Sequence, residues 1–314
     1  MPSTPPPPPH AKPVLLCFDD EHASATRLAQ VAQLELATIE RHRFPDGEIK
    51  LRLPKALPAQ VAILRTLHDP NEKLVELLLA SRCARTLGAR HLTLIAPYLA
   101  YMRQDIAFHP GEAISQRIVG QFVADLFDAV ITVDPHLHRV SSLQEAVPVP
   151  LGGAVVLSGA PLLADWIAQH RNRPLLVGPD EESAQWVALA ASRHGLDHAV
   201  CRKVRHGDCA VDIALPEVAL AGRQVVLLDD VASTGHTVAQ ATRLLLAAGA
   251  ASVDVALTHA LFANGALQRM HDAGVHEIWS TDCIAHPSNC ISMASTLAGA
   301  LAQVFAHNGA HGTN

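Results

Sequence analysis

A chain of 314 residues is long enough for two domains of ordinary size, each with its own core. Its formal net charge is −6 at pH 7, its pI is near 6.3, and it has no long basic block. These features argue against a general nucleic-acid binder. No apolar run approaches about 18 residues, so we expect no membrane-spanning helix.

The beginning of the chain and its cysteines indicate a compartment. Residues 1–12 are rich in proline and predict a disordered leader, and they lack the cationic and apolar regions of a signal peptide. Six cysteines, none of them in a C-x-x-C pair, predict reduced thiols. We therefore expect a cytoplasmic protein with no membrane partner and no nucleic-acid partner.

Apolar strand-like runs alternate with helix-like segments along most of the chain. The expected strands are Val14–Phe18, Val61–Leu64, His91–Ile95, Ala129–Val133, Leu175–Val177, Val225–Leu228 and Val253–Thr258. The expected helices are Ser24–Leu36, Asn71–Leu87, Ser115–Leu126, Gly159–Arg171, Glu182–His194 and Thr237–Ala248. This alternation is typical of βαβ units, so it predicts an α/β fold with mainly parallel sheets flanked by helices.

A cluster of proline and glycine at residues 146–153 separates two such series. We place the domain junction there, between an N-terminal domain at 13–149 and a C-terminal domain at 150–306. Residues 307–314 are polar and small, and they predict a flexible tail. Each domain has the size of one doubly wound unit, which makes two related domains in tandem plausible, although no residue-by-residue repeat is evident.

Two segments of the first half bear polar groups at positions suited to a nucleotide. Phe44, Asp46 and Glu48 lie in a turn that leads into an alternating strand, and the simplest interpretation is an ordinary hairpin. Arg103 and Gln104 follow an expected strand. Arginine pairs with polyphosphates and glutamine offers both amide groups, but a solvated loop can contain the same residues.

Two other segments place acids or imidazole at strand ends. His136 follows the expected strand Ala129–Val133, and with a nearby acid it can hold a hydrated Mg²⁺ ion. A hydrogen bond to the backbone is the alternative in a chain with 19 histidines. Asp180 follows the strand at 175–177 and precedes a helix that begins with acids. Acids at a helix start commonly just complement the helix dipole, so Asp180, which lies before the helix, is the better candidate for binding a ligand.

The most informative segment runs from residue 225 to residue 237. An apolar run ends in two adjacent acids and a hydroxyl-rich loop, and a helix follows. The loop therefore lies at the carboxyl end of a strand, where open α/β sheets bind ligands. Its hydroxyl and N–H groups suit a phosphate at a helix N-terminus, and the acids suit two sugar hydroxyls. The residues concerned are Asp229, Asp230, Ser233, Thr234, Gly235 and Thr237.

In this order, the segments resemble those of the ribose-phosphate diphosphokinase (PRPP synthetase) family, from about residue 13 to residue 305. The resemblance implies two phosphoribosyltransferase-like domains and the transfer of diphosphate from ATP to ribose 5-phosphate with Mg²⁺. It assigns ribose 5-phosphate to the six residues of the loop after residue 228, and Mg²⁺ to His136 and Asp180. It assigns ATP to Arg103 and Gln104 and to the hairpin residues Phe44, Asp46 and Glu48. The hairpin would reach the adenine site of a neighbouring subunit in a homo-oligomer.

The family also has a mobile loop with a K-x-R element, and Lys203 and Arg205 occupy the corresponding place. Two cations there can neutralise the charge that develops on the transferred group. Departures from the family pattern are Glu181 and Glu182, where many members have glycine, and His236 in the phosphate loop. His236 can assist phosphate binding when protonated or point outward.

Two other functions remain open from the sequence. A phosphoribosyltransferase that consumes PRPP accounts for the loop at 225–237 but leaves the first half without a role. A regulatory homologue that binds synthetase subunits without turnover is favoured by the altered Glu181 and Glu182, whereas the intact basic pair and acid pair count against it.

Overall fold

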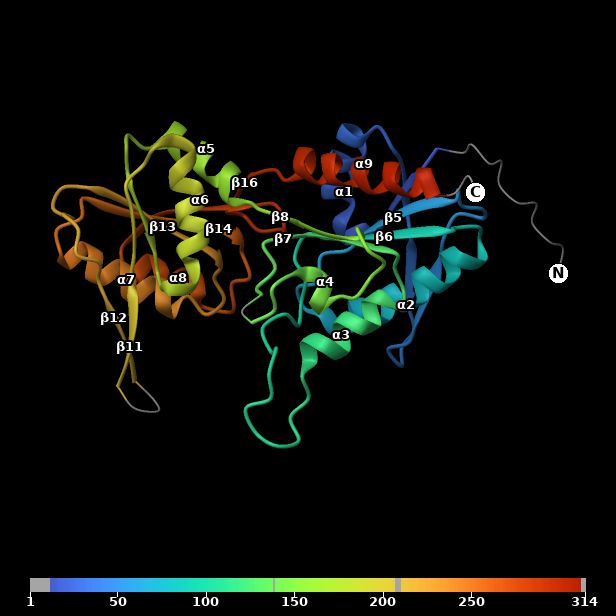
Figure 1. Ribbon diagram of the computed structural model, residues 1–314, viewed down its shortest axis with the longest axis horizontal. Coiled ribbons are helices and arrows are strands. Elements are labelled where there is room, and N and C mark those ends of the chain that lie inside the picture. Colours follow the sequence, from blue (N-terminus) through green and yellow to red (C-terminus); the bar gives the residue numbers. More distant parts are fainter. Residues whose placement is uncertain (1–11, 138, 207–209, 312–314) are drawn as a thin grey trace. The chain divides into compact units, whose positions relative to one another are not determined.

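The computed structural model describes residues 12–137, 139–206 and 210–311, and these residues form two compact units. The first unit extends to Leu157 and includes the segment from Ala294 onward, while the second is Ser158–Met293. Each unit is built on one six-stranded sheet (Figure 1). Residues 1–11 of the expected leader and residues 312–314 of the expected tail lie outside the described residues.

The sheet of the first unit is parallel throughout, with the order β2-β1-β5-β6-β7-β8. Its strands are β1 (Val14–Cys17), β2 (Glu35–Thr38), β5 (Gln60–Leu64), β6 (His91–Ala96), β7 (Ala129–Val133) and β8 (Ala154–Leu157). The helices are α1 (His22–Ala32), α2 (Pro70–Thr86), α3 (Ser115–Ala124), α4 (Leu143–Ala146) and α9 (Ala294–His311), and η1 (Asp19–Glu21) is a 3₁₀ turn. A separate antiparallel hairpin joins β3 (Glu40–Arg43) to β4 (Ile49–Arg52).

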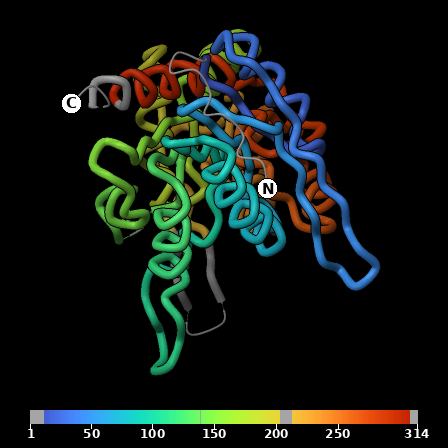
Figure 2. Tube along the Cα trace, turned by 90° about the vertical axis from the view of Figure 1, so that its right-hand side faces the viewer, coloured from blue at the N-terminus to red at the C-terminus, as the bar shows by residue number. Residues whose placement is uncertain are grey.

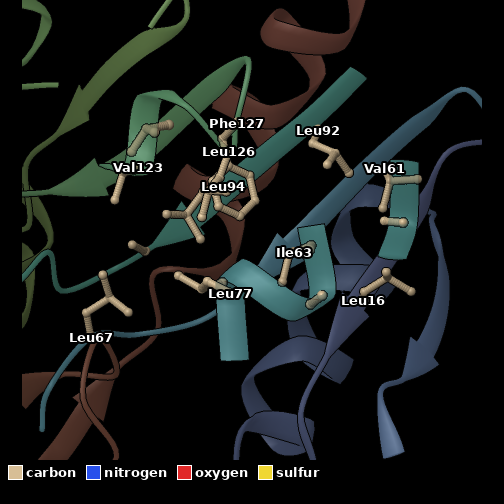
Figure 3. Packing of buried hydrophobic residues seen from close by; sticks show 14 of the residues in the cluster. Leu16, Val61, Ile63, Leu67, Leu77, Leu92, Leu94, Val123, Leu126 and Phe127 are labelled. Carbon is tan, nitrogen blue, oxygen red and sulfur yellow. The ribbon is translucent and has the colours of Figure 1, made fainter. Parts of the chain in front are cut away.

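Alternation along the buried strands explains how helices cover both faces of this sheet. Leu16, Ile63 and Leu94 lie in one apolar cluster with Leu77 of α2 and Val123 of α3 (Figure 3). The intervening residues point to the opposite face, because successive side chains of a strand alternate. There α1 packs on β1, and α9 packs on α1, β7 and β8.

The second unit repeats this plan. Its parallel sheet has the order β10-β9-β13-β14-β15-β16. The strands are β9 (Leu175–Gly178), β10 (His198–Val200), β13 (Gln224–Val231), β14 (Ser252–His259), β15 (Val275–Thr281) and β16 (Asn289–Ile291). The helices are α5 (Ala160–His170), α6 (Ala184–His194), α7 (His236–Ala247) and α8 (Ala266–Asp272), with a 3₁₀ turn at η2 (Glu181–Ser183). An antiparallel hairpin joins β11 (Arg202–His206) to β12 (Ala210–Ala214).

The two units share one order of elements, which the sequence did not reveal as a residue-by-residue repeat. In each, a strand, a helix and an edge strand precede an antiparallel hairpin, and the remaining parallel strands follow. The hairpin β3–β4 of the first unit therefore corresponds to the hairpin β11–β12 of the second. In the second unit Val225 and Leu227 face α7, while Val226 and Leu228 face α5 and α6.

Several boundaries differ from the sequence expectations. The helix expected at Ser24–Leu36 ends at Ala32, because Gln33 adopts a left-handed conformation with φ 55°, and Glu35–Thr38 forms the edge strand β2. The junction expected at residue 149 lies within the first unit, since β8 pairs with β7. The C-terminal helix α9 also belongs to the first unit and continues through His311, past the expected start of the tail.

The described cysteines, at positions 17, 83, 201, 283 and 290, are free thiols. Within the described part of the chain, no helix is both long and apolar enough to cross a membrane.

Candidate active site

The acid pair of the second unit lies inside strand β13 rather than after it. Parallel pairing with β14 continues through Asp229 and Val231, which extends the strand beyond the expected end at Leu228. Asp230 is 3% exposed, and its N–H donates to Oδ1 of Asp229 at 3.0 Å. Both carboxyl groups are thus fixed by a central strand of the sheet.

A third carboxyl group approaches this pair from the neighbouring strand. Because β9 pairs with β13 with Val177 opposite Leu227, Asp180 follows β9 at the same edge of the sheet as Asp229. Burial, together with the charges of Asp230 and Asp180, raises the pKa of Asp229 well above its ordinary value. The repulsion among these carboxyl groups favours a bound cation or a set of hydroxyl donors.

The turn at Asp180 is rigidly built. Asp180 is 7% exposed, and its Oδ1 accepts the N–H of Glu182 at 3.1 Å. Ser183 is fully buried and donates its hydroxyl to the carbonyl of Asp180 at 2.6 Å. Glu181 and Glu182 themselves are exposed, so their bulk and charge lie at the surface of the turn.

The loop between β13 and α7 has the conformation expected of an anion site. Gly235 caps α7 with φ 72°, a value that favours glycine, and its carbonyl accepts the N–H of Ala239 at 2.9 Å. The carbonyl of Ser233 accepts the N–H of Ala263 at 3.0 Å, and Arg269 of α8 donates to the carbonyl of Thr234. These two bonds join the loop to residues that follow β14 and to α8. The first N–H groups of a helix such as α7 have no partner within the helix, so they suit a phosphate.

The remaining loop residues lie at the start of α7. Thr237 is half-buried, and His236, the first residue of the helix, is exposed. An exposed imidazole at that position can still meet a phosphate when it is protonated.

The basic pair expected in a mobile loop lies on strand β11. Lys203 is opposite Ile213 and Arg205 is opposite Val211 in the antiparallel hairpin β11–β12. Arg202 adjoins this pair on the same strand and is opposite Ala214. Residues 207–209, between the strands, lie outside the described residues.

In the first unit, the hairpin β3–β4 carries its expected residues at the turn. Phe44 is 38% exposed, and its N–H donates to the carbonyl of Glu48 at 2.8 Å. Asp46 accepts the N–H of Glu48 at 3.2 Å, which closes the turn. Lys50 lies 6.0 Å from the centre of the Phe44 ring. An exposed aromatic ring beside a cation can stack on a planar, electron-rich ligand.

Arg103, Gln104 and His136 lie after neighbouring strands of the first sheet, since β6 pairs with β7. Arg103 is exposed, whereas Gln104 accepts the hydroxyl of Ser115 at 2.8 Å. His136 is half-buried and follows Asp134, which has a left-handed φ of 36°.

The sequence interpretation missed the ion pair that joins these two loops. Arg139 donates from Nη1 to the buried carboxylate of Asp105 at 2.7 Å, and its N–H donates to the same group at 3.2 Å. The only sign of this pair in the sequence is the acid of the Arg-Gln-Asp segment, Asp105. Its partner lies 34 residues away in the chain, and local sequence does not indicate which cation it meets.

Among the described residues, no group of three or more histidine, cysteine, aspartate or glutamate side chains is arranged to hold a metal ion. A site for Mg²⁺ needs fewer protein ligands, because the ion keeps several waters and takes one or two carboxylates plus substrate phosphates. The buried Asp180, whose charge acts on Asp229 of the adjacent strand, fits that requirement.

Two parallel sheets with the same strand order, the second with acids and a phosphate-suited loop at its carboxyl edge, define an α/β protein of two phosphoribosyltransferase-like domains. Residues 14–129 match the family model of the N-terminal domain of ribose phosphate pyrophosphokinase, and residues 156–294 match that of the phosphoribosyl transferase domain. The fold class and the tandem arrangement expected from the sequence are confirmed.

Curated relatives extend over nearly the whole chain. A ribose-phosphate pyrophosphokinase of Methanopyrus kandleri is 36% identical over 278 residues, which are 88% of this chain and 94% of the relative. One from Halobacterium salinarum is 31% identical over 291 residues, 92% of this chain and 100% of the relative. The chain belongs to the ribose-phosphate pyrophosphokinase family and is an enzyme of that kind.

The solved structure of phosphoribosylpyrophosphate synthetase from Mycobacterium smegmatis has the same fold. It superposes with a TM-score of 0.81 and covers 95% of this chain and 100% of its own. The sequences are 24% identical, so this likeness concerns the fold. The ribose-phosphate pyrophosphokinases match both units of this chain. A phosphoribosyltransferase, the alternative that left the first half without a role, does not account for that match.

Proposed function

We propose that this enzyme transfers the β,γ-diphosphate of ATP to the 1-hydroxyl of ribose 5-phosphate, giving PRPP and AMP in the presence of Mg²⁺. The observation that carries the proposal is the carboxyl edge of the second sheet, where Asp229 and Asp230 of β13, Asp180 after the adjacent β9, and a glycine-capped loop suited to phosphate lie at the same edge. That arrangement suits a sugar phosphate. The first unit offers an exposed aromatic ring and an exposed arginine for a nucleotide.

Ribose 5-phosphate is bound through both parts of that edge. Ser233, Thr234, Gly235 and Thr237 receive the 5-phosphate at the start of α7, and Asp229 and Asp230 accept hydrogen bonds from two adjacent sugar hydroxyls. This orientation presents the 1-hydroxyl to the nucleotide. Positioning of this kind supplies a large part of the acceleration in phosphoryl transfer.

The nucleotide is bound by the residues of the first unit. Arg103 pairs with the polyphosphate and Gln104 adds an amide. Phe44, Asp46 and Glu48 receive the adenine, and we propose that they do so in a neighbouring subunit of a homo-oligomer. His136 and Asp180 would each offer a ligand to Mg²⁺, which would supply charge neutralisation on the phosphates when bound. A cytoplasmic location is part of the same proposal.

The reaction is an attack of the sugar O1 on the β-phosphorus of ATP. The O1–Pβ bond forms, the bond between Pβ and the oxygen bridging to Pα breaks, and AMP leaves with that electron pair. The proton of the 1-hydroxyl is lost to solvent. Negative charge grows on the nonbridging and leaving oxygens, where Lys203 and Arg205 of β11 can stabilise it.

Kinetics of two variants on the same strand test the role of this basic pair. Lys203→Ala is expected to lower kcat by about 10²-fold to 10³-fold with little change in either KM, because the interaction forms mainly in the transition state. Arg202→Ala, which removes a neighbouring cation of β11 that the K-x-R resemblance does not include, is the matched control and is expected to retain kcat. Equal losses in both variants, or a change confined to KM, would contradict the assignment.

A further inference from the structure

The hairpin β3–β4 carries the residues proposed for the nucleotide, yet it is not part of the six-stranded sheet. It forms a sheet of two strands only and projects from the first unit (Figure 2). A two-stranded hairpin is marginally stable in water by itself. Contacts between its side chains and the rest of the unit must therefore set its direction.

Apolar packing does not fix the end of the hairpin that bears the turn. A concavity of about 480 Å³ separates it from α2, with a lining of Arg43, Gly47, Glu48, Ile49, Glu72, Val75 and Leu79. On the helix side, Val75 is 49% exposed and Leu79 is 39% exposed. The turn is thus carried over an open space, and its position depends on how the base of the hairpin is held.

At that base, Leu51 of β4 packs against the apolar cluster of the first unit, and Arg41 of β3 makes the charged connection to η1 and α2. Its guanidinium group bonds to Asp19 of η1 at 3.0 Å, lies 3.8 Å from Asp20, and donates to Oε1 of Glu76 on α2. Glu76 is fully buried. A buried carboxylate is costly unless it is paired and hydrogen-bonded, so this contact is constrained by burial in a way that a surface ion pair is not.

The partner of Arg41 is itself held in a fixed place. The other oxygen of Glu76 accepts from Arg65, a guanidinium group that is 1% exposed. Arg65 also donates to both carboxylate oxygens of Asp20 at 2.8 Å. Phe18 lies beneath both cations, with its ring centre 4.6 Å from Arg65 and 5.8 Å from Arg41. The base of the hairpin is therefore connected to a largely buried network in which two arginines share the carboxylates of Glu76 and Asp20.

A second ion pair continues the same line of contacts toward the turn. Arg43, two residues after Arg41 and on the same side of β3, pairs with Glu72, which precedes Glu76 by one turn of α2. This pair is about half exposed. Arg41 and Arg43 are one strand repeat apart, and their partners Glu76 and Glu72 are one helical turn apart. The two ion pairs together therefore hold both the base of the hairpin and its angle to α2.

The chain also provides a comparison within the hairpin. Arg52 of β4 pairs with Glu40 of β3, directly opposite in the register, and both side chains are more than half exposed. This pair joins one strand of the hairpin to the other and does not connect the hairpin to α2. Its loss removes a positive charge from the hairpin without releasing the base.

We propose that Arg41 is a positioning residue that sets the nucleotide-binding hairpin against the core through the buried Glu76. The inference rests on the proposed function, because it assumes that Phe44, Asp46 and Glu48 contact ATP. Arg41 itself does not bind the nucleotide. It acts by keeping the hairpin turn in the place where those residues meet the substrate.

Steady-state kinetics of the full chain test this role. KM is measured for ATP at saturating ribose 5-phosphate, and for ribose 5-phosphate at saturating ATP, in the wild type, Arg41→Gln, Arg52→Gln and Phe44→Ala. Arg41→Gln is expected to raise KM for ATP about tenfold and to leave KM for ribose 5-phosphate unchanged, because misplacement of a binding element acts on its own substrate. Arg52→Gln is expected to change neither constant.

The variants separate the failure of this role from the failure of the assignment to ATP. If Phe44→Ala leaves KM for ATP unchanged, the hairpin does not bind ATP and the inference falls with that assignment. A raised KM in Phe44→Ala but not in Arg41→Gln overturns the positioning role alone. Equal changes for both substrates would show a general structural role and overturn it too.

Should Arg41→Gln fail to fold, Glu72→Gln carries the same test from outside the hairpin, since it removes the second contact with α2. A selective increase in KM for ATP supports the inference. An unchanged KM in that variant overturns it.

Discussion

Glu21 is a buried carboxyl group at the end of η1, and its replacement by glutamine is expected to change how stability depends on pH. The side chain is 8% exposed. Its Oε1 accepts the N–H of Thr66 at 2.6 Å, and its Oε2 lies 3.5 Å from Nη1 of Arg65. Burial raises the pKa of Glu21 from 4.5 to about 7, although the charges of Arg65 and Lys73 act in the opposite direction.

The sign of the effect follows from which state holds the proton. Between pH 4.5 and about pH 7, Glu21 is protonated in the folded protein and ionised in the unfolded chain. The folded state then binds more protons, so the free energy of unfolding falls as pH rises through this window. A difference in pKa of that size corresponds to about 3 kcal/mol at most. Glu21→Gln cannot ionise and should lack this contribution.

Urea unfolding of the wild type and Glu21→Gln at several pH values between 4.5 and 8 provides the assay. We expect the variant to gain stability relative to the wild type as pH rises to about 7, and the difference to stay constant above that pH. Comparing the two proteins at each pH removes the contributions of other titrating groups. A constant difference across the whole range would refute the reasoning, as would a difference of opposite sign.

Two further variants address the sugar-phosphate edge. Asp229→Asn replaces a group whose charged form is disfavoured by burial and by two neighbouring carboxyl groups. It should raise the free energy of unfolding of the ligand-free protein at pH 7.5 by about 1 kcal/mol while weakening ribose 5-phosphate binding. A loss in urea-unfolding stability would contradict this. At Gly178, an added Cβ would lie 2.2 Å from Oγ of Ser183. Gly178→Ala should therefore cost about 1–3 kcal/mol by overpacking, and Gly178→Ala with Ser183→Ala should recover part of it in the same assay; an unaffected single variant would show that the turn at Asp180 yields easily.

The sequence predicts the interior of the sheets well because burial there is a local pattern. Val225–Leu228 are β-branched or leucine residues in succession, and all four are buried in β13. The same rule fails at the end of this strand. Asp229 and Asp230 are polar and resemble the beginning of a loop, but pairing with β14 continues through them, and that pairing depends on a partner 28 residues further along the chain.

Elements at the edges and ends are missed for a related reason. Strand β2 at Glu35–Thr38 is half-exposed, so it lacks an apolar run, and the left-handed Gln33 that precedes it has no side-chain signature. Helix α9 folds onto the first unit although it follows the second in sequence. Such a contact between distant segments cannot be derived from local periodicity.

The site residues divide in the same way. The segment at 229–237 combines acids, hydroxyls and glycine within nine residues, so its chemistry is visible in the sequence. The network of Arg41, Arg65 and Glu76 draws its members from β3, the end of β5 and α2. None of these residues lies in a recognisable motif. Only the fold brings them together.

Product analysis tests the central claim most directly. Purified full-length protein is incubated with Mg²⁺, ATP and ribose 5-phosphate, and AMP and PRPP are followed together by chromatography and phosphorus NMR. Transfer of the intact diphosphate predicts AMP and PRPP in equal amounts, with neither formed when ribose 5-phosphate is omitted. Folded protein that yields neither product, or ADP in place of AMP, would contradict the proposed reaction.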